Sequence, residues 1–268
     1  RSGRVSTGVY AFVATLLGFV GFPLELPTML LAAFTFMCLT MSIMTFNDIA
    51  DRKRDALPDK ARIFALEHER EMLSYWLWGA IFIWMLIAIL FRINPTLAAF
   101  CMIVWVIGLW YSYMPHLFLA QNVLVAFCSA SPLLCGMVSN DLSLSEHWAT
   151  FRLMLWIVLL NEFNKDVGDR HYDVDYKNTM PVYFDSHRQP YRVRRSAIFA
   201  APLVVVIVVE AMHHPNQWLG YLVVCFGLVL VRHHVMLAIH PIFVTRSIKT
   251  IRRLIYTIGA VLAISAII

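Results

Sequence analysis

Two groups of polar residues could do chemistry in this chain, because each directly follows an apolar stretch. The first group consists of Asn47, Asp48, Asp51 and Asp55. The second group consists of Glu162, Asp166, Asp169 and Asp173. Charged groups beside hydrocarbon are costly, so such residues are functional candidates. Carboxylates are ligands for hard divalent cations, and bound Mg²⁺ in turn holds phosphates.

The spacing within each group predicts a row of side chains on one helix face. Asn47, Asp51 and Asp55 follow at intervals of four, and the acids of the second group at intervals of four, three and four; both patterns match one helical face. Such rows repel themselves unless a divalent cation neutralises them. Salt bridges to interleaved Arg and Lys at the membrane boundary are the alternative. No His or Cys spacing suggests zinc.

The elements that carry these groups are predicted to be membrane helices. The 268 residues are 60% hydrophobic with a mean hydropathy of +0.67, and 15% are charged against roughly 25% in soluble proteins. We therefore expect an all-α, polytopic membrane protein, a bundle of nine transmembrane helices forming a single integral-membrane domain over residues 1–268. The predicted spans are about 7–24, 28–46, 73–91, 96–113, 117–138, 148–164, 196–213, 217–239 and 253–268.

Charge in the connecting loops predicts the topology. Lys and Arg concentrate after the second, sixth and eighth predicted spans, and Arg92 and Arg152 are the exceptions near the opposite side. The positive-inside rule then places the N-terminus and both acidic groups in the cytoplasm. Two long charged loops could cap a cytoplasmic cavity. The four spans between the acidic groups suggest a repeated four-helix unit, with coincidence as the alternative. The basic residues lie in the loops predicted to be cytoplasmic, a distribution that membrane topology explains, so nothing in the sequence favours nucleic-acid binding.

The two acidic groups carry a family resemblance. The pattern from Asn47 to Asp55 resembles the NDxxDxxxD signature of the UbiA superfamily of intramembrane prenyltransferases. The segment from Lys165 to Asp173 resembles that family's second motif, and the following Lys177-Asn-Thr-Met-Pro-Val resembles the K-x-T-L-P-V element that trails it. The resemblance extends over essentially the whole chain, since the motifs follow the second and sixth of nine predicted helices.

The resemblance implies a magnesium-dependent reaction of an isoprenyl diphosphate within the membrane. Two Mg²⁺ ions would be held by Asn47, Asp51, Asp55, Asp169 and Asp173. The metals would draw charge from the leaving diphosphate and leave an allylic carbocation. Basic groups would neutralise the diphosphate; the candidates are Lys60, Arg62, Lys165, Arg170 and Lys177. Aromatic faces would shelter the cation; the candidates are Trp105, Trp110, Tyr111 and Tyr113.

Three further assignments stay open in sequence. Glu162 or Asp166 would assist deprotonation of an acceptor. In the segment after the fourth predicted helix, Tyr111 and the later Asn122 fit the family, but no Lys or Arg is present; His116 or a basic loop residue would substitute. Arg232 either reaches the cytoplasmic surface or binds an anionic group in the cavity.

Three functions compete. The first is a prenyltransferase that joins an isoprenyl chain to an aromatic or other lipophilic acceptor. The second is a membrane terpene cyclase of the same fold, in which the substrate's own alkenes capture the cation. The third is a transporter with acidic cation sites; transporters place such sites near the bilayer midplane, whereas the acids here lie at helix ends, which favours an enzyme acting on a lipid with its head group in the interface.

Overall fold

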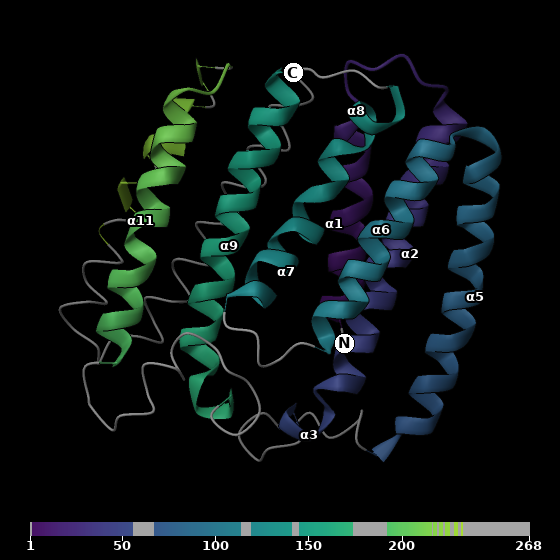
Figure 1. The fold of residues 1–268 in the computed structure, drawn as a ribbon, viewed down its shortest axis with the longest axis horizontal. Helices are drawn as coiled ribbons and strands as arrows, with labels where there is room; N and C mark the ends of the chain where they lie inside the picture. Colours follow the sequence, from purple (N-terminus) through teal and green to yellow (C-terminus); the bar gives the residue numbers. More distant parts are fainter. Residues whose placement is uncertain are drawn as a thin grey trace. The chain divides into compact units, whose positions relative to one another are not determined.

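The computed structural model describes residues 2–55, 67–113, 119–140, 145–173, 192–215 and scattered positions from 217 to 232. For residues 2–6, 54–55, 145–146, 167–173 and 192–200 it describes the backbone only. Every regular element in this described part of the chain is a helix (Figure 1). This confirms the predicted all-α class.

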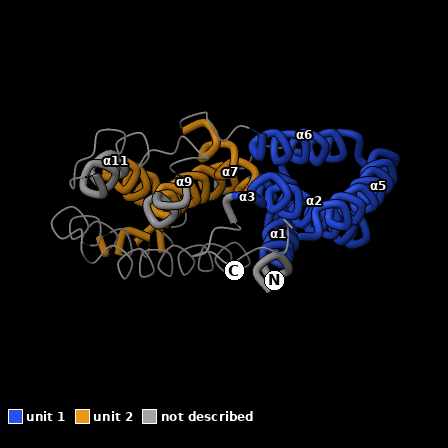
Figure 2. Tube along the Cα trace, turned by 90° about the horizontal axis from the view of Figure 1, so that it is seen from below, with its two compact units in different colours: residues 1–114, 131–144 blue, residues 115–130, 145–268 orange. Residues whose placement is uncertain are grey.

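The helices fall into two compact units, coloured separately in Figure 2. Unit 1 covers residues 1–114 and 131–144, and unit 2 covers 115–130 and 145–268. The helices of unit 1 are α1 (Ser2–Gly18), α2 (Leu26–Ala50), α3 (Arg52–Asp55), α5 (Glu69–Ile93), α6 (Pro95–Ser112), the 3₁₀ turn η1 (Ser131–Leu134) and α8 (Cys135–Asn140). Those of unit 2 are α7 (Ala120–Ala130), α9 (Ser145–Asp173) and α11 (Arg192–Met212).

Helix α2 is central to unit 1. It packs against α1 on one side and against α5 and α6 on the other, and α5 also packs against α6. Its buried positions include Phe36 and Leu39, each 1% exposed. In unit 2, α9 packs against both α7 and α11, with Ile157 and Leu160 fully buried. Each acidic group therefore continues from a helix whose apolar part is fixed by its neighbours.

Local sequence explains where α5 ends and α6 begins. The Asn94 side-chain oxygen accepts a hydrogen bond from the Leu97 amide at 2.9 Å, which satisfies a free donor of the first turn of α6. The Asn94 amide nitrogen donates to the Ser139 carbonyl at 2.9 Å. Pro95 occupies the first helical position, where its missing N–H costs nothing. Asn94 thus closes the α5–α6 turn and fastens it to α8.

Small residues let α1 approach η1 and α8. A Cβ on Gly18 would lie 2.5 Å from the Pro132 carbonyl oxygen, and a Cβ on Gly136 would collide with the Gly18 carbonyl oxygen and the Phe22 ring. Close backbone contacts through small residues are typical of helix packing in membranes. These glycines therefore set the contact between α1 and the turn that Pro132 introduces.

The described part of the chain contains four helical stretches long and apolar enough to span a membrane: Leu26–Ala50, Glu69–Ile93, Pro95–Ser112 and Ala120–Asn140. Thr7–Gly18 and Ala201–Met212 are shorter apolar helices. The four long stretches correspond to the predicted spans 28–46, 73–91, 96–113 and 117–138. The two shorter helices correspond to the predicted spans 7–24 and 196–213. The predicted span 148–164 lies within α9. Residues 253–268 and most of the predicted span 217–239 lie outside the described residues.

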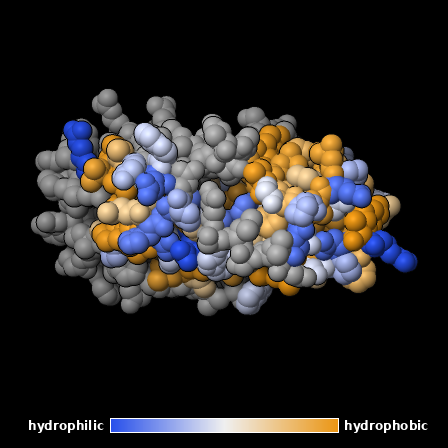
Figure 3. All heavy atoms as spheres, turned by 90° about the horizontal axis from the view of Figure 1, so that it is seen from above, coloured by the Kyte–Doolittle hydropathy of each residue, from blue (hydrophilic) through white to orange (hydrophobic). Residues whose placement is uncertain are grey.

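Much of the surface of these helices is apolar. Seen from the end where α5 meets α6, hydrophobic residues cover much of the described surface of unit 1, with hydrophilic residues between them (Figure 3). Along α5, exposed side chains include Trp78 (68%), Trp84 (52%) and Phe91 (56%). Large apolar surfaces are rare on monomeric soluble proteins, and together with the four stretches long and apolar enough to span a membrane they indicate an integral membrane protein.

Candidate active site

The first acidic group lies where α2 gives way to α3. The Asp51 amide donates to the Asn47 carbonyl at 2.8 Å, so helical hydrogen bonding extends to Asp51. The Asn47 side-chain amide donates to Asp51 Oδ2 at 3.3 Å, and the two side chains therefore share one face as the spacing predicts. Asp51 caps α2 with φ −86° and ψ 4°, and Asp55 ends α3 one turn later. The structure divides the predicted continuous row at Asp51.

Arg52 fastens this junction to the start of α5. Its guanidinium donates to the Ile49 carbonyl at 2.8 Å and pairs with Glu69 at 2.8 Å. The first bond satisfies a carbonyl at the end of α2, and the second anchors α3 to the first turn of α5. This interleaved basic residue therefore has a structural role, and its acidic partner Glu69 belongs to neither of the two acidic groups.

Three aromatic rings lie together beside Asn47. The ring of Phe46 lies 4.8 Å from that of Trp76 and 5.2 Å from that of Tyr113. Tyr113 is 71% exposed, so one face of this group is open. Sequence reasoning missed Phe46, although it precedes Asn47 directly, and it missed Trp76, which tertiary packing brings from α5.

The other aromatic candidates are placed differently. Trp105 is 5% exposed and donates to Ser42 Oγ at 3.3 Å, so its indole belongs to the core of unit 1. Trp110 is 52% exposed and Tyr111 is 7% exposed. The ring of Tyr113 contacts Phe46, the residue that precedes Asn47.

The second acidic group lies on α9, which continues from its apolar part to Asp173. The spacing predicts that Glu162, Asp166, Asp169 and Asp173 lie on one helix, and α9 contains all four without a break. Glu162 pairs with Lys165 at 3.1 Å. Asp166 Oδ2 accepts a hydrogen bond from the Asn122 amide of α7 at 2.8 Å. Asn122 is 7% exposed, so a buried amide fixes this carboxylate.

Two further amides on α9 lie just before the acids. Asn161 Oδ1 and Asn164 Nδ2 are buried and lack a hydrogen-bond partner among the described residues, and Asn164 is 3% exposed. Buried polar groups are normally satisfied, so these two atoms are available to a water or a ligand group. Their spacing of three, directly after the apolar run that ends at Leu160, is the signal that the sequence carries for them.

The remaining predicted site residues are described partly or not at all. Lys60, Arg62, His116 and Lys177, together with the loop segments 56–66 and 174–191, lie outside the described residues. Asp55, Asp169, Arg170 and Asp173 lie in helices whose backbone alone is described there. Arg232 is a described helical position with an exposed side chain. Tyr111 is buried near the end of α6.

The donor set at the first group suits a hard cation. Asn47 and Asp51 bring an amide oxygen and a carboxylate to one turn, and oxygen donors are those that Mg²⁺ prefers. No group of three or more His, Cys, Asp or Glu side chains positioned for a metal occurs among the described residues. Three members of the predicted metal set, Asp55, Asp169 and Asp173, have side chains beyond that description.

Solved structures show the same fold. The chain resembles the digeranylgeranylglyceryl phosphate synthase in membranes, with a TM-score of 0.73, 16% identity and coverage of 99% of this chain and 95% of that one. It resembles the apo UbiA homologue from Aeropyrum pernix K1, with a TM-score of 0.71, 14% identity and coverage of 99% and 97%. It also resembles a UbiA homologue from Archaeoglobus fulgidus bound to GPP and Mg²⁺, with a TM-score of 0.67, 16% identity and coverage of 97% of this chain and 98% of that one.

Sequence comparisons give two results. No curated protein sequence matches this chain significantly. The model of the UbiA prenyltransferase family matches residues 3–241, a range that includes both acidic groups and all of the helices above except Ser2, the first residue of α1. By this match over most of its length, together with the shared fold, the chain belongs to the UbiA prenyltransferase family.

Proposed function

We propose that this protein is an Mg²⁺-dependent intramembrane prenyltransferase that ionises an isoprenyl diphosphate and transfers the prenyl group to an aromatic or other lipophilic acceptor. The observation that carries the proposal is the Asn47–Asp51 pair at the end of the apolar helix α2, within a chain of the prenyltransferase family. Its position at a helix end suits a substrate with a charged head group at the membrane surface and a tail among the helices.

The metal ligands in this proposal are Asn47, Asp51, Asp55, Asp169 and Asp173. Bound Mg²⁺ supplies positive charge to the departing diphosphate. The Archaeoglobus fulgidus homologues bound to Mg²⁺ with GPP or with DMAPP support this assignment, as does the oxygen-rich donor set of the first group. Asn47 orients the Asp51 carboxylate through its 3.3 Å hydrogen bond.

The other residues of the site hold the substrate and the carboxylates in position. Lys60, Arg62, Lys165, Arg170 and Lys177 neutralise the diphosphate, and Tyr111, His116 and Arg232 complete its binding. Asn122 fixes Asp166. The exposed face of the Phe46–Tyr113 pair, next to Asn47, shelters the allylic cation. Glu162, already paired with Lys165, and Asp166 remain the two candidates for deprotonating an acceptor.

The proposed architecture completes this assignment. Nine transmembrane helices over residues 1–268 form one integral-membrane domain, built from two repeated four-helix units, with the N-terminus, the site and its cap loops in the cytoplasm. The division of the chain into two compact units, each with one acidic group, supports the repeat. The concentration of Lys and Arg in the loops next to the acids supports the orientation.

A membrane terpene cyclase is the second candidate. The segment from Tyr111 to Asn122 contains no Lys or Arg, so a basic residue expected there for the diphosphate is missing. Asn122 itself is engaged with Asp166. A site with a different arrangement around the diphosphate suits a reaction in which no external acceptor takes part.

One experiment separates the two candidates. Purified protein is incubated with Mg²⁺ and farnesyl or geranylgeranyl diphosphate, with and without a panel of phenolic and quinone-precursor acceptors, and lipid products are identified by mass spectrometry. Prenylated product that requires an acceptor supports transfer. A cyclic hydrocarbon formed without acceptor contradicts transfer and supports the cyclase. Absence of Mg²⁺-dependent diphosphate release under every condition would refute both.

A further inference from the structure

The two arginines that break the charge pattern of the chain have different surroundings. Arg152, in unit 2, pairs with Glu210 at 3.0 Å. Arg92, in unit 1, has no ion pair or hydrogen bond with any of the described residues. It lies in the last turn of α5, where the helix dipole favours a cation. Within the described part of the chain, no acidic side chain therefore neutralises its charge.

The position of Arg92 places that anion at the membrane boundary far from the acidic group. The Arg52–Glu69 ion pair fixes the start of α5 beside the first acidic group. Helix α5 then runs over 25 residues to Ile93, which at 1.5 Å per residue is about 36 Å. The hydrocarbon core of a bilayer is about 30 Å thick. Arg92 consequently reaches the opposite head-group region from Asn47 and Asp51.

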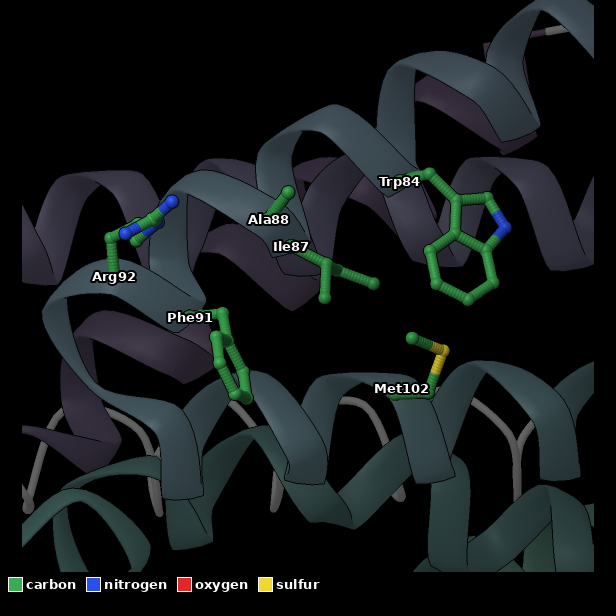
Figure 4. A pocket seen from close by; sticks show the side chains of 6 residues that line it. All are labelled: Trp84, Ile87, Ala88, Phe91, Arg92 and Met102. Carbon is green, nitrogen blue, oxygen red and sulfur yellow. The ribbon is translucent and has the colours of Figure 1, made fainter.

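An apolar groove leads from Arg92 along the exposed side of α5. It has a volume of about 390 Å³ and is lined by Trp84, Ile87, Ala88, Phe91 and Arg92 of α5 and Met102 of α6. Figure 4 shows Arg92 and Trp84 at its two ends, with Ile87 and Phe91 between them and Met102 facing from the other helix. The groove is open to the surroundings, because Trp84 and Phe91 are each more than half exposed.

The surroundings of this groove in the membrane are hydrocarbon. The apolar part of α5 is 28% buried, against 44% to 50% for the other three candidate spans, so α5 presents the most surface to lipid among them. From Trp84 to Arg92 the groove extends about 12 Å along the helix. One leaflet of the hydrocarbon core is about 15 Å deep. The groove therefore matches one acyl chain lying along the helix, with its head group at Arg92.

We propose that this groove is a binding site for an anionic phospholipid, with one acyl chain between Trp84 and Met102 and the lipid phosphate paired with Arg92. The planar guanidinium donates two parallel hydrogen bonds to a phosphate. In phosphatidylcholine the choline cation already lies beside the phosphate and repels the arginine. Phosphatidylglycerol has no such cation, so the site prefers phosphatidylglycerol. The groove is separate from the first acidic group, since both of its ends lie beyond the aromatic group at Phe46 and Trp76 along α5.

The test measures lipid retention by native mass spectrometry of the full chain, purified in mild detergent and titrated with phosphatidylglycerol or phosphatidylcholine. The wild type is expected to retain one phosphatidylglycerol about tenfold more strongly than phosphatidylcholine. R92Q should lose this preference, and R92K should retain most of it. A88W fills the exposed groove and should reduce retention of both lipids. R152Q is the matched control, because its arginine is already paired, and it should behave as the wild type.

Three outcomes would overturn the proposal. Unchanged retention in both R92Q and A88W would show that lipid binds elsewhere. Equal retention of the two lipids by the wild type would remove the role of Arg92. A change of oligomeric state in A88W, with lipid retention unchanged, would assign the groove to a second copy of the chain. Thermal unfolding of each variant, compared with R152Q, distinguishes loss of lipid from loss of fold.

Discussion

The side-chain amide of Asn122 donates a hydrogen bond to Asp166 Oδ2 at 2.8 Å, and so joins α7 to the acidic end of α9. The two residues are 44 positions apart in the chain. Asp166 is intermediate in exposure and Asn122 is buried, so the contact lies at the edge of the packed part of unit 2. This bond fixes the helix that also carries Asp169 and Asp173.

Replacing Asn122 with alanine should therefore impair the reaction without unfolding the protein. A hydrogen bond to a charged group is worth about 1.5–3 kcal/mol, so kcat/KM should fall by about 10- to 100-fold if the bond is needed in the transition state. The measurement is the steady-state rate of diphosphate release at saturating Mg²⁺.

Gln121 provides the control for Asn122, since it is the preceding residue on α7 and a similar amide. Q121A should retain wild-type activity. Equal activity in N122A and the wild type would contradict the positioning role of Asn122, and equal loss in N122A and Q121A would indicate a general disturbance of α7.

The first acidic group should be needed for metal-dependent turnover. D51N keeps the shape of the side chain but removes its charge. Changing a residue that only supports a metal ligand lowers activity by up to roughly 100-fold, so the loss of activity in D51N should be larger than that. E71Q is a matched control, because Glu71 lies in the exposed first turn of α5. Activity assays over a range of Mg²⁺ concentrations test this, and full activity of D51N at ordinary Mg²⁺ would refute the ligand assignment.

Removal of divalent cations should stop the reaction reversibly. The donors of the proposed set are oxygens, so chelation with EDTA should abolish diphosphate release, and added Mg²⁺ should restore it. Zn²⁺ should restore it poorly, since no Cys or His lies in the set. Sustained release in the presence of excess chelator would contradict a metal-dependent mechanism.

The close contact between α1 and α8 should be the most sensitive point of unit 1 to added bulk. A methyl group on Gly136 meets the Gly18 carbonyl oxygen and the Phe22 ring, so G136A should destabilise the fold by about 1–3 kcal/mol. At Gly79 a Cβ meets nothing within 4 Å, and G79A should be neutral or stabilising by up to about 1 kcal/mol. Thermal unfolding in detergent compares them, and equal midpoints would contradict the packing.

Local signals in the sequence were sufficient to predict the helices and to predict which of their side chains share a helix face. Apolar length predicts α2, α5 and α6, and the predicted span 96–113 matches α6 to within one residue at each end. The interval of four between Asn47 and Asp51 predicts their shared face, which their hydrogen bond confirms. These features depend on residues within one or two helical turns, so periodicity and charge determine them.

Contacts between helices could not be predicted in the same way. Nothing local to Asn122 indicates Asp166 as its partner, and Trp76 meets Phe46 because α5 packs on α2. Trp105 was expected among the aromatic candidates, yet its face of α6 packs inward, where Ser42 accepts its N–H. The ion pair between Arg52 of α3 and Glu69 of α5 likewise joins residues from two helices, and no local pattern indicates it.

The most direct test of the account is Mg²⁺-dependent release of diphosphate from an isoprenyl diphosphate by the wild type, D51N, D169N and the double variant. If both acidic groups act on one diphosphate, each single variant should lose nearly all activity, and the double variant should be little worse, because residues that act as a unit are not additive. Near-wild-type release by either single variant would contradict the account.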